Sequence, residues 1–461
     1  MPCTLRGCRA SASLLLVLLP CLLCAIARSA DLQSQVDPLA TRLIEDGQVV
    51  GMVVGIVRGD EVEFLVYGET KKDSGQAPGK DTVYEIGSIT KVFTGVLLAD
   101  AIRSGKVELD DPLQQHLPDG VKVPVIDDEA ITLLHLTTHT SGLPRMPGNF
   151  RPADPDQPYV DYDRKKMLSQ LAEVKLSRTP GTYEYSNYAV GLLGEVLADG
   201  WKQPYEKVLV ERIFKPLELN DTRMTLSDSM RERFAPGYNS ALKEVPGWDF
   251  EAFAGAGAVR STAADMVKFI QANLADEDTP ISHVLHDAQQ IQPTPADGQR
   301  MALGWHLAGD GITRWHNGMT GGYHSWLAII PDRNVGVVVL SNTATMKVTH
   351  FGEQVTRIAA GESVKPSPRR REVEVDTDVL EKYVGVYRLA PQFELTVTLE
   401  DGHLMVQATG QPKAQVYAES PTKFFYKIVD AQITFIPSKD GVAEKLILHQ
   451  LGRNMEAPRR E

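Results

Sequence analysis

The sequence SITK, residues 88–91, opens an apolar stretch with helical spacing and is followed along the chain by YSN at 185–187 and HNG at 316–318. The third motif stands at the head of a strand-like run. On a helix, residues three positions apart lie on one face, so Ser88 and Lys91 would be neighbours. A lysine beside a serine is one of the few ways to activate a hydroxyl without histidine, which makes this pair a candidate catalytic pair.

The spacing of serine and lysine alone is a weak signal, because it occurs again at 240–243 and 420–423. Neither of these copies precedes an apolar pattern with helical spacing. An isolated tetrad of this kind is ordinarily a helix-capping serine with a solvated lysine. The order and spacing of all three motifs favour Ser88 as a nucleophile.

Together the motifs resemble those of the penicillin-recognising serine hydrolases, which are the class C β-lactamases, the D,D-peptidases and related esterases. Supporting matches are YEIGS at 84–88, LTTHTSGLP at 136–144, PGT at 180–182, GAG at 255–257 and GGYHS at 321–325. The resemblance implies an α+β fold, in which an antiparallel sheet is flanked by helices and carries an inserted helical subdomain. It also implies acyl-serine chemistry without a metal or an organic cofactor.

Catalytic roles follow from the same resemblance. Ser88 would attack the substrate, and Lys91 and Tyr185 would transfer the proton. Which of the two takes the first proton stays open, as it does in a related β-lactamase class. For Lys91 to act, its ammonium must be desolvated or lie near other cations, so that its pKa falls toward the working pH.

Substrate-binding roles are implied for four further residues. Asn187 would hydrogen-bond the acyl amide of the substrate, and His316 would orient it. Gly318 would let the substrate backbone lie close to the strand. The N–H group of Met319, together with that of Ser88, would hold the oxyanion.

His316 marks a departure, because most members of the resembled family have Lys-Thr-Gly at this motif. A lysine is a permanent cation that can hold a substrate carboxylate, whereas histidine is charged only in part near neutral pH. If His316 holds an anion, binding should strengthen as the pH falls through about 6.5. Arg314, two residues earlier on the same strand face, is a possible substitute for the missing lysine.

Three functions therefore stay open on the sequence. The first is hydrolysis of an amide, either a β-lactam ring or a D-amino-acid peptide of the cell wall. The second is a carboxylesterase with the same machinery, and the third is a penicillin-binding sensor that does not turn over. A zinc site at His135 and His139 is disfavoured, because no HExxH pattern or third clustered ligand accompanies them.

The first 27 residues have the pattern of a signal peptide, with Arg6 and Arg9 ahead of an apolar core at 14–23. All four cysteines lie in this leader, so the mature chain would contain no disulfide. We expect a periplasmic or secreted protein without a membrane span after leader removal. The formal net charge of −12 disfavours nucleic acid as a partner. The family resemblance implies a small-molecule or peptidoglycan-derived substrate.

The remaining chain divides into a hydrolase domain at 28–360, a linker at 361–372 and a second domain at 373–461. The linker combines prolines with a run of arginines. Beyond it, short alternating strands are broken at Asp-Gly pairs, which is typical of a small antiparallel barrel. This barrel resembles the lipocalin-like domain attached to some of these hydrolases. It would be an accessory module that joins copies of the chain or restricts the substrate.

Within the hydrolase domain the pattern predicts hairpins at 49–67 and 326–340 and a helix over 88–105. Thr262 and Asp265 have the spacing of a capping box ahead of another helix. Strands at both ends with helices between them favour a sheet in which the N- and C-terminal strands pair.

Overall fold

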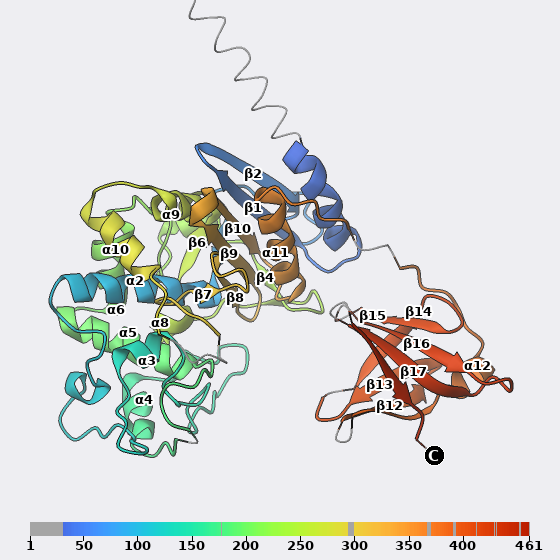
Figure 1. The fold of residues 1–461 in the computed structure, drawn as a ribbon. Coiled ribbons are helices and arrows are strands. Elements are labelled where there is room, and N and C mark those ends of the chain that lie inside the picture. The colour runs from blue at the N-terminus through green and yellow to red at the C-terminus, as the bar shows by residue number, and fades with distance from the viewer. Residues whose placement is uncertain are drawn as a thin grey trace, which may run out of the picture. The chain divides into compact units, whose positions relative to one another are not determined.

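The computed structural model describes the chain as two separate units (Figure 1). The described residues are 31–176, 178–293, 299–366, 370–390, 393–411, 413–427, 429, 431–450 and 453–460. The units are Met1–Lys365 and Pro366–Glu461, so the division falls within the stretch expected to be a linker. The signal peptide expected at 1–27 lies outside the described residues.

An antiparallel six-stranded sheet, in the order β2-β1-β10-β9-β8-β7, forms the centre of the first unit. Its strands are β1 (Gly51–Arg58), β2 (Glu61–Gly68), β7 (His306–Leu307), β8 (Arg314–Met319), β9 (His324–Ile330) and β10 (Val335–Ser341). β1 pairs with β10 from Met52 opposite Ser341 to Arg58 opposite Val335. The predicted pairing of the N- and C-terminal strands is therefore confirmed, and so are the two predicted hairpins, β1–β2 and β9–β10.

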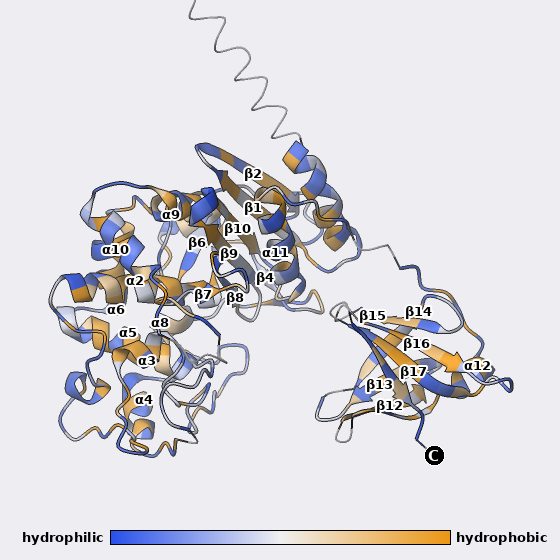
Figure 2. Ribbon diagram, viewed as in Figure 1, coloured by the Kyte–Doolittle hydropathy of each residue, from blue (hydrophilic) through white to orange (hydrophobic). Residues whose placement is uncertain are grey.

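Helices cover both faces of this sheet. α9 (Ala263–Leu274) lies on one face, where its Ile270 shares a core with Val338 of β10. α11 (Lys347–Ala359) lies on the other face, where its Val355 shares a second core with Val339. Because strand side chains alternate between faces, β10 is hydrophobic at every position but its glycine and its final serine, and it is buried throughout. Figure 2 shows the central strands as hydrophobic.

A helical subdomain is inserted between β2 and β7. Its helices are η1 (Gly87–Ile89), α2 (Thr90–Arg103), η2 (Leu113–His116), α3 (Leu133–Thr137), α4 (Arg164–Leu171), α5 (Asn187–Trp201), α6 (Tyr205–Leu209), η3 (Val210–Phe214), α7 (Asp228–Glu232), α8 (Ala254–Gly257) and α10 (Pro280–Ala288). α2 packs against α5, α8 and α10 and is buried from Thr90 to Ala101. The predicted helix over 88–105 is thus a short 3₁₀ turn followed by α2.

Short strands and turns complete the unit. They are β3 (Val83–Glu85), β4 (Gly237–Tyr238), β5 (Glu244–Val245), β6 (Arg260–Thr262) and η4 (Pro331–Arg333). β3 pairs with β6, which joins the segment just before Ser88 to the segment just before α9.

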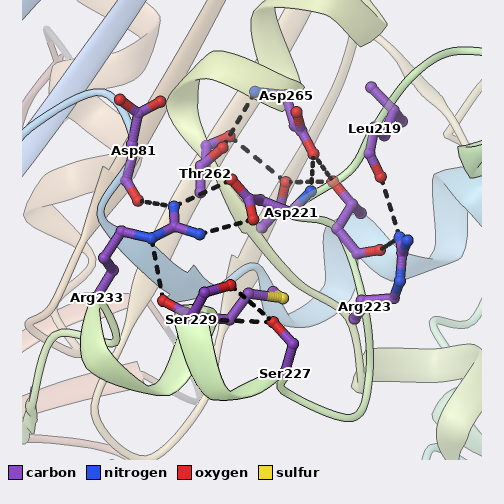
Figure 3. A network of polar contacts seen from close by, with 12 residues as sticks. Asp81, Leu219, Asp221, Arg223, Ser227, Ser229, Arg233, Thr262 and Asp265 are labelled. Atoms are coloured by element: carbon purple, nitrogen blue, oxygen red, sulfur yellow. Dashed lines mark hydrogen bonds and ion pairs between the residues drawn. The ribbon is translucent and has the colours of Figure 1, made fainter.

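A polar network anchors the start of α9 (Figure 3). Thr262 caps the helix by accepting a hydrogen bond from the Asp265 N–H at 3.1 Å. The Asp265 carboxylate accepts from the Asp221 N–H at 2.7 Å, and Asp221 is held in turn by Arg233 in a two-pronged ion pair. The capping residue predicted from the sequence is confirmed, while the Asp265 side chain bonds a distant loop because that loop supplies buried donors.

The second unit is an eight-stranded antiparallel sheet in sequence order. Its elements are α12 (Thr377–Glu381), β11 (Gly385–Ala390), β12 (Phe393–Glu400), β13 (His403–Ala408), β14 (Ala414–Ala418), β15 (Lys423–Tyr426), β16 (Ala431–Pro437), β17 (Ala443–Gln450) and β18 (Arg453–Pro458). A bridge between Tyr387 and Arg459 brings the first strand to the end of the last, so the barrel is nearly closed. The predicted small antiparallel barrel is confirmed. Asp401 and Gly402 both have positive φ, as a tight hairpin turn requires.

Across the residues that the structure describes, no helix has the length and apolar character needed to cross a membrane.

Candidate active site

Ser88 and Lys91 meet where η1 runs into α2. The Lys91 ammonium nitrogen Nζ lies 3.0 Å from Ser88 Oγ and 2.6 Å from the carbonyl oxygen of Ala256. Ser88 is partly exposed, whereas Lys91 is only 1% exposed. The structure therefore places a reachable hydroxyl beside a buried amine, as the spacing predicted.

The position of Ser88 depends on the glycine before it. Gly87 has a φ of +49°, and a Cβ there would lie 2.8 Å from the backbone nitrogen of Met319. Only glycine avoids both the strain of this conformation and the clash. The close approach brings the backbone of β8 to the first turn of η1.

Burial governs the charge of Lys91. Desolvation holds the pKa of Lys91 well below its usual value, and the nearby positive charge of Arg145 lowers it further. Among the described residues no carboxylate forms an ion pair with Lys91. A neutral amine next to Ser88 Oγ can accept the hydroxyl proton.

Tyr185 lies just before α5 and faces the same pair. Its ring centroid is 5.0 Å from Lys91 Nζ. Enclosure by protein raises the pKa of Tyr185, and the neighbouring Ser88 hydroxyl offsets this effect only in part. Tyr185 is thus a neutral phenol, which can donate a proton more readily than accept one.

The segment before α5 is clamped to the loop at 144–145. The Ser186 hydroxyl caps α5 by accepting from the Ala189 N–H and donates to the Pro144 carbonyl at 2.7 Å. The Asn187 N–H donates to the Arg145 carbonyl at 3.0 Å. Asn187 is itself partly exposed, with its side-chain nitrogen 3.7 Å from Met146 Sδ. The structure therefore brings Asn187 to the edge of the same site.

On β8, Gly318 and Met319 pass directly beside the serine turn. A Cβ at Gly318 would lie 2.0 Å from the Ile86 carbonyl, so this position requires glycine. The Thr320 N–H donates to the Tyr323 carbonyl at 3.0 Å, and the alternation of an antiparallel pair then directs the Met319 N–H away from β9. The Met319 backbone nitrogen lies against Gly87, the residue before Ser88, where an oxyanion donor would be needed.

His316 differs from the expectation in its charge. It is 0% exposed, and burial together with the neighbouring His306 and Lys91 holds its pKa well below the usual value. Its Nδ1 atom lies 2.6 Å from the Asn317 carbonyl oxygen. The partly charged imidazole expected near neutral pH is therefore replaced by a neutral one, because the ring is enclosed by protein.

Arg314 does not replace the missing lysine. Its guanidinium donates to the Ile312 carbonyl at 2.6 Å, and the charges that act on it are those of Asp310 and Asp332. It lies four residues before Gly318, at the end of β8 away from the serine turn.

Two histidines to which the sequence analysis assigned no catalytic role, His139 and His306, complete the surroundings of Tyr185. The centroid of the His139 ring lies 4.3 Å from that of Tyr185 in a tilted arrangement, and the His306 ring lies 4.8 Å from that of His316. Burial lowers the pKa of His306 to about 4, and that of His139 falls well below the usual range. His139 has a φ of +58° and accepts the Ser186 N–H on Nδ1, so it supports the site structurally.

His135, four residues earlier, lies outside the site, because it forms the capping box of α3 with Thr132.

The other two Ser-x-x-Lys tetrads lie in hairpin turns. Residues 240–243 connect β4 to β5, and residues 420–423 lead into β15, where Ser420 accepts from the Lys423 N–H.

Comparison with known proteins places these motifs in a family. The β-lactamase family model matches residues 36–360, and a model described as a domain of unknown function matches residues 369–458. The chain is 31% identical over 332 residues to the D-alanyl-D-alanine-carboxypeptidase/endopeptidase AmpH of Escherichia coli, covering 66% of this chain and 82% of that protein. It is 27% identical over 354 residues to a β-lactamase of Pseudomonas fluorescens, covering 68% of this chain and 94% of the relative.

Solved structures give the same picture. The β-lactamase/D-alanine carboxypeptidase from Yersinia pestis, complexed with citrate, matches with a TM-score of 0.62 and 28% identity over 72% of this chain and 98% of that one. A class C β-lactamase from Rhodobacter sphaeroides has the same fold, with a TM-score of 0.60 and 24% identity over 71% of this chain and 98% of that one. The chain therefore belongs to the β-lactamase family and is a serine hydrolase of the class C β-lactamase and D,D-peptidase type.

Proposed function

We propose that this protein is an exported hydrolase that cleaves an amide bond through an acyl-enzyme on Ser88. The substrate would be a β-lactam ring or a D-amino-acid peptide of the cell wall, in keeping with relatives named β-lactamase and D-alanyl-D-alanine carboxypeptidase. The observation that carries the proposal is the 3.0 Å contact between Ser88 Oγ and a buried Lys91 whose pKa is strongly lowered.

Acylation begins with the transfer of the Ser88 proton to the neutral amine of Lys91. The opposite pKa directions of Lys91 and Tyr185 support this order, because the lysine loses its proton easily and the phenol keeps its own. The serine oxygen then attacks the carbonyl carbon. The N–H groups of Ser88 and Met319 stabilise the oxyanion that forms.

Collapse of this intermediate expels the amine, which needs a proton. The Tyr185 hydroxyl, which lies near Ser88 and Lys91, donates that proton and is reprotonated from Lys91. In the second half-reaction water attacks the acyl group, and the same residues move the proton in the reverse direction. Asn187 and Gly318 border the acyl group during both steps.

An esterase with the same machinery is the second candidate. The observation that favours it is the neutral, buried His316 in the strand motif, which leaves β8 without the fixed cation expected to hold the carboxylate of a β-lactam or a terminal D-alanine. An ester also has a better leaving group, so it depends less on proton donation by Tyr185.

Labelling with a fluorescent penicillin tests the proposal. Wild-type protein should acquire a label that mass spectrometry locates on Ser88, and Ser88→Ala should acquire none. Transient label indicates a β-lactamase, and persistent label indicates a slow peptidase or a sensor. Rapid cleavage of a p-nitrophenyl ester without any penicillin label would replace the amide proposal with the esterase.

Export and assembly belong to the proposal as well. The basic and apolar pattern of residues 1–27 supports a cleaved leader and a periplasmic or secreted location. Joining of copies through the barrel remains a prediction. Comparing the N-terminal sequence of the protein purified from the periplasm with that of the full chain would test export.

A further inference from the structure

Arg145 ends the sequence SGLPR at residues 141–145, and it brings the only cation of this loop to the active site. Its guanidinium carbon Cζ lies 5.0 Å from the centroid of the Tyr185 ring, and its side chain is exposed. Within the described ranges, Arg145 makes no ion pair and its guanidinium makes no hydrogen bond with another side chain or with the backbone. An exposed guanidinium beside the proton-transfer pair is thus available to a ligand.

We propose that Arg145 binds an anionic group of the substrate, a carboxylate, and so makes this enzyme selective for substrates that carry one. The inference rests on the proposed function, since it concerns the substrate of the same site. Strand β8 has no exposed cation to bind the substrate carboxylate. The inference assigns this binding to Arg145, in the loop on the Tyr185 side of the site.

The backbone around Arg145 fixes where the guanidinium starts. The Arg145 carbonyl accepts from the N–H groups of Asn187 at 3.0 Å and Tyr188 at 3.3 Å, while the Pro144 carbonyl accepts from the Ser186 hydroxyl. These contacts hold residue 145 against the first turn of α5, the element that also positions Tyr185. A substrate in contact with Ser88 and Asn187 therefore passes within reach of the arginine.

The charges around Arg145 favour an anion. The titratable groups on which its charge acts are Lys91, His139, Tyr159, Tyr183 and Tyr185. None of them is a carboxylate. Burial lowers the pKa values of the amine and the imidazole and raises those of the phenols, so it disfavours the charged form of all five groups, and Arg145 is the exposed cation among them.

Glu85, the buried carboxyl group three residues before Ser88, does not neutralise Arg145, because it is paired with Arg260 at 3.2 Å. A guanidinium without a protein partner is well suited to a carboxylate, which it can bind through two parallel hydrogen bonds. A neutral substrate would leave this group to solvent and gain nothing from it.

The test compares matched substrates that differ only in the anionic group. Benzylpenicillin and its methyl ester form one pair, and mono-p-nitrophenyl glutarate and p-nitrophenyl valerate form a second pair for the case of an esterase. Arg145→Gln removes the charge but leaves the backbone contacts in place. Arg151→Gln is the matched control, because Arg151 is exposed on the same loop and its guanidinium bonds only the Phe150 carbonyl.

We expect Arg145→Gln to lower kcat/KM for the carboxylate substrate of the reactive pair by roughly 10- to 100-fold, mostly through KM, as the loss of a charged hydrogen bond implies. The neutral partner should change by less than about 3-fold. Arg145→Lys should restore part of the loss, since it keeps the charge without the two-pronged geometry. In wild-type enzyme, added salt should narrow the gap between the pair members, which tests the inference without any substitution.

Equal losses on both members of a pair, with a shifted pH profile for the neutral one, would overturn the inference and assign Arg145 to the tuning of Lys91. Unchanged kinetics on both members would overturn it too. Failure of the proposed function gives a different result, in which wild-type protein forms no adduct on Ser88 with any of the four probes.

Discussion

The two units of the molecule bury different kinds of side chain. The first unit encloses Lys91, the carboxyl group of Glu85 and four imidazoles, those of His139, His306, His316 and His324. In the described part of the second unit, the buried side chains are hydrophobic, with Tyr387, Phe424 and Leu446 among them. One unit holds ionisable groups out of water, and the other is an ordinary apolar barrel core.

The two units also differ in whether their buried polar side-chain atoms have hydrogen-bond partners. Over the residues that the structure describes, every buried side-chain polar atom without a hydrogen-bond partner lies in the first unit, and His139, His306 and His316 each contribute one. Each such atom costs about 1–3 kcal/mol of stability. Active sites are where this cost is tolerated, because groups kept neutral and preorganised are what the chemistry requires. The buried ionisable groups therefore favour the first unit as the place of catalysis, and the accessory role of the barrel stays a prediction.

The largest expected effect separates the three Ser-x-x-Lys tetrads. Ser88→Ala should abolish the covalent adduct, whereas Ser240→Ala and Ser420→Ala, which change turns in the first and second unit, should leave it intact. Only Ser88 touches a buried lysine. Intact-mass measurement after incubation with the probe checks this, and an adduct on Ser240 or Ser420 would refute the assignment.

The second effect concerns the two proton-transfer residues. Lys91→Ala and Tyr185→Phe should each reduce turnover roughly 100- to 10,000-fold, the usual contribution of a general acid or base. Lys91 contacts Ser88 and lies 5.0 Å from the Tyr185 ring, so the two residues should act as one unit and the double variant should lose little more than the worse single variant. Steady-state kinetics of the three variants decide the matter. Losses that multiply would mean that the two residues act independently.

Acid should weaken the first unit more than the barrel. His306 is neutral in the fold because burial lowers its pKa to about 4, while the unfolded chain titrates near 6.5. A lowered pKa means that the unfolded state binds more protons between these values, so the stabilisation is complete above about 6.5 and is lost as the pH falls toward 4. By pH 5 this group alone costs about 2 kcal/mol.

His324, with a pKa also lowered to about 4, and the more deeply shifted His139 and His316 act in the same direction. Glu85 acts in the opposite direction, because its raised pKa of about 7 stabilises the fold as the pH falls, and it offsets roughly one histidine. All five tryptophans precede residue 366, so their fluorescence follows the first unit alone in a thermal melt. A melting temperature that is unchanged between pH 8 and pH 5 would contradict this prediction.

The smallest effect is expected from removing the barrel. A chain truncated after Lys365 keeps the whole sheet, both faces of helices and every group around Ser88. It should remain soluble and form the acyl-enzyme at a rate close to that of the full chain, with changes confined to assembly or substrate range. A folded truncation that no longer acylates, as judged by circular dichroism and probe labelling, would show that the barrel contributes to the site.

Sequence patterns predict the scaffold well because they record periodicity. The hairpins around β1 and β10 and the strands of the barrel follow from alternation and turn residues, and the contact of Ser88 with Lys91 follows from helical spacing. The motif order also brings Tyr185 and Met319 to the same place. These features depend on local chemistry, which a sequence displays directly.

The sequence did not predict which side chains are buried at the site or which loops contact it. The neutral state of His316 depends on enclosure by His306 and other distant residues, and no spacing links 306 to 316 as neighbours across a strand pair. Arg145 follows a recognisable SGLP motif, yet its approach to Tyr185 depends on the backbone bonds between that loop and α5. The burial of His316 and the position of Arg145 both depend on tertiary contacts, and together they determine the charge at the site.

The charge state of Lys91 tests the central claim most directly, because the whole account needs a neutral amine beside Ser88. In protein containing ¹³C-labelled lysine, the Cε signal that disappears in Lys91→Arg can be followed through a pH titration. We predict that this signal is that of an uncharged amine at pH 8, because burial lowers the pKa of Lys91 well below the reference lysine value of about 10.4. A Lys91 signal that titrates together with the exposed lysines would contradict the account.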